Sequence, residues 1–100
     1  MKILKSNQIL LLDNPKEYII DLFVRLCQLN YFTKTRPLVE AEQIEVMLIL
    51  EAITNTIGRQ DALVNECIDI FRISFNMYKD FYKSWDLVKD YLNNRITINN

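Results

Sequence analysis

The sequence predicts an all-α fold, a small helical bundle with an antiparallel helical hairpin (about residues 15–32 and 38–57) and one long C-terminal helix (about residues 60–92). Two observations predict it. The only strong helix breakers, Pro15, Pro37 and Gly58, each stand where a helical pattern begins or ends. Residues 59–100 contain no glycine or proline and keep apolar residues on one helical face, opposite an unbroken polar face. With 100 residues, half of them apolar, we expect one domain with one core.

The two ends of this single domain, residues 1–100, are expected to be less regular. Residues 1–13 fit a short helix or an irregular arm, because no second strand-like segment exists with which they could pair. Residues 94–100 include three asparagines, and we expect a frayed tail or a short extension.

The first helix of the hairpin has a clear start signal. Asn14 can cap the helix, Pro15 suits the first helical position, and Glu17 follows three residues after the cap. The polar segment 33–37 then predicts a connector, because the residue before a proline is disfavoured in a helix.

The second helix should end at Gly58, since glycine adopts positive φ at little cost. Glu40, Glu42 and Glu45 in its first turns favour the helix dipole. Residues 46–50 are apolar all round, which predicts a central helix with neighbours on two sides.

The long helix is too long for its own domain. At 1.5 Å per residue its 32 or so residues span roughly 48 Å, whereas a compact domain of this size is roughly 34 Å across. Either the helix breaks near Lys83 and Ser84, with Ser84 as a new cap, or its aromatic end docks on another chain. The apolar register passes through Ser84 unchanged, which favours the unbroken helix.

This aromatic end is the candidate interaction surface. Tyrosine and tryptophan combine an apolar ring with a polar tip and are enriched at interfaces. The alternative is that these residues have a purely structural role in the domain's own core. The candidate interaction residues are Tyr78, Phe81, Tyr82, Trp85, Val88, Tyr91 and Leu92.

A nucleic-acid-binding regulator is the alternative from another class. The chain around Gly58 loosely resembles a helix-turn-helix, and the candidate cations are Arg59, Lys79, Lys83 and Lys89. Asp61 and Glu66 would however face phosphates, and the net charge is −1, so we expect weak, non-specific binding. A structural subunit of a larger particle is a further alternative.

Catalysis finds little support in the sequence. The sequence has no histidine, so it lacks the commonest general base. Its single glycine cannot build a glycine-rich phosphate-binding loop. Cys27 and Cys67 fall on apolar faces without metal or redox spacing, which predicts buried thiols. We therefore expect no enzyme activity, no cofactor, no metal and no small-molecule ligand.

The leading hypothesis is a non-enzymatic protein–protein interaction module, such as an adaptor, assembly factor or small regulator. We expect it to bind itself, as a homodimer or higher oligomer, or another protein, since most soluble oligomers are homo-oligomers. The first twelve residues lack signal-peptide features, and no apolar run approaches the roughly 18 residues that cross a bilayer, which favours a cytoplasmic protein.

Overall fold

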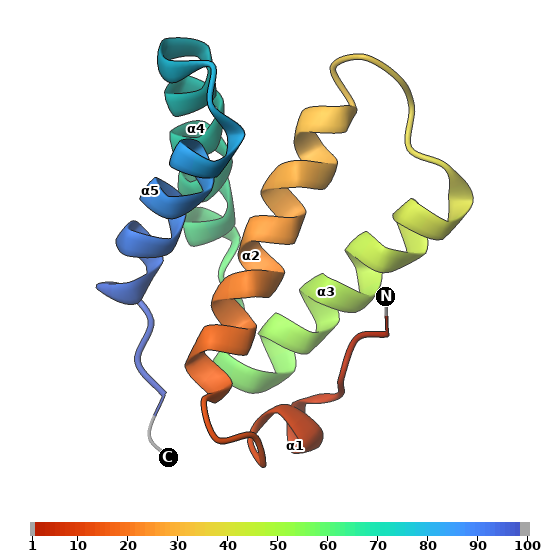
Figure 1. The fold of residues 1–100 in the computed structure, drawn as a ribbon. Coiled ribbons are helices and arrows are strands. Elements are labelled where there is room, and N and C mark those ends of the chain that lie inside the picture. Colours follow the sequence, from red (N-terminus) through yellow and green to blue (C-terminus); the bar gives the residue numbers. More distant parts are fainter. Residues whose placement is uncertain (1, 99–100) are drawn as a thin grey trace.

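The computed structural model describes residues 2–98, and the elements within them are all helical. They are α1 (Ser6–Ile9), α2 (Pro15–Phe32), α3 (Glu40–Ile57), α4 (Asp61–Tyr78) and α5 (Phe81–Asn93). The all-α helical bundle is confirmed. Figure 1 shows α2 in the middle of the bundle, with α3 on one side and the α4–α5 pair on the other. The Cα radius of gyration is 13.3 Å.

The chain ends follow the predictions in part. Residues 2–5 are irregular, and the backbone N–H of Leu4 donates to the Tyr18 hydroxyl at 2.9 Å, which ties this arm to α2. The short helix α1 then packs on α3. At the other end the helix stops at Asn93, but the expected fraying is wrong for Ile96, which is buried in the core. Met1, Asn99 and Asn100 lie outside the described residues.

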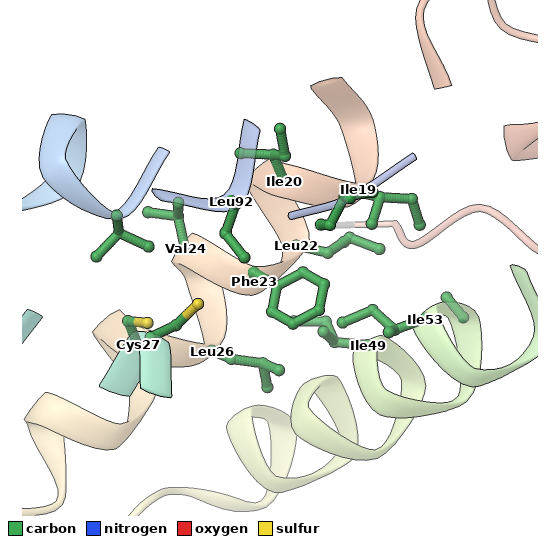
Figure 2. Close-up of a cluster of buried hydrophobic side chains, with 14 of the residues drawn as sticks. Ile19, Ile20, Leu22, Phe23, Val24, Leu26, Cys27, Ile49, Ile53 and Leu92 are labelled. Carbon is green, nitrogen blue, oxygen red and sulfur yellow. The ribbon is translucent and has the colours of Figure 1, made fainter. Parts of the chain in front are cut away.

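The central helix is α2, and its start agrees with the sequence. The Asn14 side chain accepts a hydrogen bond from the backbone N–H of Glu17 at 3.2 Å, with Pro15 in the first turn. Because α2 touches α3, α4 and α5, it is apolar around most of its circumference. Figure 2 shows Phe23 beside Ile49 of α3. The apolar side chains of α2 that are buried are Ile19, Ile20, Leu22, Phe23, Val24, Leu26, Cys27 and Leu29.

The prediction that residues 38–57 form the central helix is wrong in its placement. Helix α3 packs mainly on α2 and α1, and it buries one narrow stripe of Ile49, Ala52 and Ile53. It ends as expected, because Gly58 has φ 84° and its N–H donates to the carbonyl of Thr54 at 2.9 Å. The apolar run at 46–50 therefore reaches solvent on its outer side, as detailed below.

The predicted long helix over residues 60–92 is also wrong, because the chain breaks at Lys79 and Asp80. Lys79 adopts the left-handed conformation (φ 54°, ψ 27°), and its N–H donates to the carbonyl of Phe75 at 2.9 Å. Asp80 then caps α5, accepting from the backbone N–H of Lys83 at 3.1 Å. Ser84, the alternative cap, instead lies inside α5, buried, and donates to the carbonyl of Asp80 at 3.0 Å.

The free energy of burial explains this break. A non-glycine residue in the left-handed region costs about 1–2 kcal/mol. Folding α5 back fully buries Val88 and Leu92 and covers much of Trp85. Each fully buried aliphatic side chain contributes about 1.5–3 kcal/mol, so two already exceed the cost of the turn.

Candidate interaction surfaces

The apolar face of α5, predicted to bind a partner, is mostly used within the monomer. Val88 and Leu92 have no exposed surface, so they cannot serve as docking residues of the folded chain. The overhang that motivated the prediction does not exist, because the turn at Lys79 and Asp80 places α5 against α4 and α2. These two residues belong to the core.

A cluster of aromatic side chains joins α2, α4 and α5. The ring centroids of Phe71 and Phe81 lie 5.4 Å apart, and those of Phe81 and Trp85 lie 5.3 Å apart. Tyr31 of α2 extends the cluster to Phe75, at 4.9 Å between centroids. Rings at 4.5–7 Å in edge or tilted contact are favourable, so Phe81 and Trp85 stabilise the packing of α5 on α4.

Tyr91, at the far end of α5, also connects α5 to α4. Its hydroxyl donates to the Glu66 carboxylate of α4. This hydrogen bond is the main reason why the pKa of Tyr91 lies above its ordinary value. The Arg95 guanidinium lies over the Tyr91 ring at 4.6 Å, so this residue too is engaged within the monomer.

Two of the predicted interaction residues remain open to solvent, at the turn between α4 and α5. Tyr82 is 80% exposed and Tyr78 is 44% exposed. The ammonium of Lys83 lies 4.0 Å from the centroid of the Tyr78 ring, a cation–π contact that holds the pair in place. We call Tyr78, Lys79, Tyr82 and Lys83 the tip. It is an aromatic and cationic projection at one end of the bundle.

A second exposed surface, on α3, was missed by the sequence reasoning. Met47 is 69% exposed, and Ile44, Leu48 and Leu50 are 40–49% exposed. Glu40 and Glu51, one to two turns away, are exposed and belong to no ion pair among residues 2–98. We call these six residues the α3 outer face. The missed signal was the polar set Glu40, Gln43, Glu51 and Thr54, whose helical spacing places Met47 on the solvent side.

An apolar groove continues from this face toward α4. Its volume is about 220 Å³, below the roughly 300–1,000 Å³ of small-molecule pockets. That size suits an anchor side chain rather than a cofactor. The groove is lined by Leu26, Asn30, Thr33, Leu38, Val46, Leu50, Val64 and Ile68.

The four cations proposed for nucleic acid do not gather on one surface. Arg59 pairs with Asp61 at 2.6 Å, and Lys89 pairs with Asp21 at 3.3 Å. Lys79 and Lys83 lie together at the tip, beside Asp80. The helices on either side of Gly58 diverge across α2, so the turn lacks the packed helix pair of a helix-turn-helix (Figure 1).

The two thiols are placed as predicted. Cys27 and Cys67 are free and buried, and burial raises the pKa of each to about 12. Because the thiolate is the reactive form, both are poor nucleophiles near neutral pH. Within residues 2–98 no three metal-ligating side chains gather at one place.

Comparison with known proteins adds no family. No protein-family model matches the sequence, and no match is found among curated proteins or among solved structures. None of the helices in residues 2–98 combines the length and apolar character needed to cross a membrane.

Proposed function

We propose that this protein is a protein–protein interaction module that associates with itself and uses the tip as a contact surface. The observation that carries the proposal is Tyr82, a large aromatic side chain that is 80% exposed on a rigid helical hairpin. Tyrosine is enriched among the residues that dominate binding energy at interfaces. The tip is held by the Asp80 cap and by the Lys83–Tyr78 contact, so little conformational freedom is lost when it binds.

Sedimentation velocity over a range of protein concentrations tests this proposal. The wild-type chain should show an average mass that rises above the monomer value at micromolar concentrations. Tyr82→Ser should raise the dissociation constant roughly 30-fold, as truncation of an interface anchor does, while the circular dichroism spectrum stays helical.

Leu11→Ser provides the matched control, because Leu11 is 85% exposed but lies in the loop before α2, away from the tip. It should leave the mass distribution unchanged. A wild-type chain that stays monomeric at every concentration would refute the proposal.

A further inference from the structure

Within residues 2–98 the centre of the α3 outer face is open to solvent, and residues 3–7 border it at Leu48 and Glu51. Met47 lies in the middle of this face, with Glu40 and Glu51 on either side along the helix. Methionine adapts its shape to irregular partners and is frequent on binding surfaces. An apolar centre flanked by carboxylates fits an apolar or aromatic group that carries positive charge.

The charges on this face are available for such a partner. The other two glutamates of α3 already have partners, since Glu42 pairs with Arg36 at 2.7 Å and Glu45 pairs with Arg25 at 2.6 Å. Helix α3 contains no lysine or arginine of its own. The charges that α3 itself contributes to its outer face are therefore all negative, and Lys5 of the N-terminal arm lies at the edge next to Glu51.

The tip has the complementary composition. Lys79 and Lys83 belong to no ion pair within residues 2–98. The one carboxylate in the turn, that of Asp80, is engaged as the cap of α5. Tyr78 and Tyr82 supply exposed aromatic rings.

We propose that the tip of one copy docks on the α3 outer face of a second copy. This inference rests on the proposed self-association and specifies its geometry. The charges decide it: tip on tip would oppose lysines to lysines, and α3 on α3 would oppose glutamates to glutamates. Tip on α3 is the one of these three pairings that brings opposite charges together.

A single copy cannot make this contact with itself. The turn between α4 and α5 and the outer side of α3 lie on opposite sides of α2 (Figure 1). The pairing is therefore head to tail, and it leaves one tip and one α3 face free on every open assembly. Such contacts extend into open chains unless the rotation closes a ring.

In this arrangement the apolar groove beside the α3 outer face can accept the Tyr82 ring. Leu50 belongs both to the α3 outer face and to the apolar groove beside it. Asn30 and Thr33 stand in the same groove and can hydrogen-bond a phenol hydroxyl. An apolar wall with polar groups at one side is the environment that a tyrosine anchor requires.

Complementation between two variants tests the inference. Tyr82→Ser removes the tip contact, and Met47→Lys places a cation at the centre of the α3 face, where it repels Lys79 and Lys83. Each variant alone should remain monomeric by sedimentation velocity. An equimolar mixture should form a heterodimer that grows no further, because only one intact tip and one intact α3 face can meet.

Salt provides an independent readout. The opposed charges predict that association of the wild-type chain weakens between about 50 mM and 500 mM salt, as surface charges become screened. Pairing of like surfaces would instead strengthen with salt. Met47 and Tyr82 are both exposed, and circular dichroism should confirm that both variants keep their helices.

The outcomes separate this inference from the proposed function. If Tyr82→Ser is monomeric while Met47→Lys associates like the wild type, the tip pairs with itself, and only the head-to-tail arrangement fails. A mixture that stays monomeric would likewise overturn it. If the wild-type chain does not associate at all, both proposals fail.

Discussion

Helices α3 and α5 both pack on α2, but they bury their apolar residues to different degrees. One face of α5, with Ser84, Val88 and Leu92, is fully enclosed, and its partly exposed aromatics pack on the same side. In α3 a narrow stripe is buried, while Met47 and its neighbours face solvent. The difference follows from pattern rather than from apolar content: α5 has one apolar face, whereas the middle of α3 is apolar all round.

This comparison shows how an apolar segment should be interpreted. A helix with one apolar and one polar face can satisfy its apolar side against a single neighbouring layer. A helix that is apolar all round needs neighbours on every side, and within residues 2–98 α3 packs mainly on α2 and α1. The remaining apolar surface of α3 is therefore where we propose that a second copy docks.

The largest expected effect comes from truncating the same kind of side chain on the two helices. Leu92→Ala should lower the free energy of unfolding by about 3 kcal/mol, because it leaves a cavity at a fully buried site on α5. Met47→Ala on α3 should change it by less than about 0.5 kcal/mol. Chemical denaturation of both variants at a low protein concentration measures the difference. Equal losses would mean that the outer side of α3 is covered in the monomer.

The helix boundaries show which parts of this fold a sequence can predict. Residues 15–32 were predicted to be a helix from Asn14, Pro15 and Glu17, and α2 has those bounds because these signals act locally. The break at Lys79 was not predictable from local signals, since lysine has no preference for positive φ. Asp80, three residues before the backbone N–H that it caps, was the available cue.

The candidate sites divide in the same way. The role of the tip tyrosines as interface residues, which their chemistry suggests, stays a prediction. Val88 and Leu92 could not be excluded without knowing where α5 turns back. The exposure of Met47 depends on which helix occupies the centre of the bundle. That is a property of the whole packing arrangement, and residues 46–50 alone do not determine it.

The second prediction concerns the turns that precede α4 and α5. Gly58 has φ 84° and ψ 178°, a region that is essentially restricted to glycine, and nothing lies within 4 Å of an added Cβ. Gly58→Ala should therefore cost about 1–3 kcal/mol through backbone strain alone. Its counterpart is Lys79→Gly, which relieves a left-handed lysine and should stabilise by about 1 kcal/mol. Thermal melting of the two variants should show shifts of opposite sign, and shifts of the same sign would contradict the assignment of strain at these turns.

The smallest effect is expected at the start of α3. An ion pair stabilises this helix end, whereas burial of apolar side chains stabilises α5. Glu42 accepts two hydrogen bonds from Arg36, at 2.7 and 2.9 Å, and one from the backbone N–H of Val39 at 3.0 Å. The Arg36 hydrogen bonds are the main cause that lowers the pKa of Glu42 from 4.5 to about 2. Because the folded pKa is the lower one, this contribution is fully present above pH 4.5 and is lost as the pH falls toward 2.

Glu42→Gln should therefore flatten the dependence of stability on pH within that window, although only modestly for so exposed an ion pair. Glu51→Gln removes a carboxylate that has no ion-pair partner within residues 2–98 and should leave the acid response as in the wild type. Urea denaturation at several pH values measures both variants, and an unchanged acid response in Glu42→Gln would show that the Arg36–Glu42 pair does not hold α3 in solution.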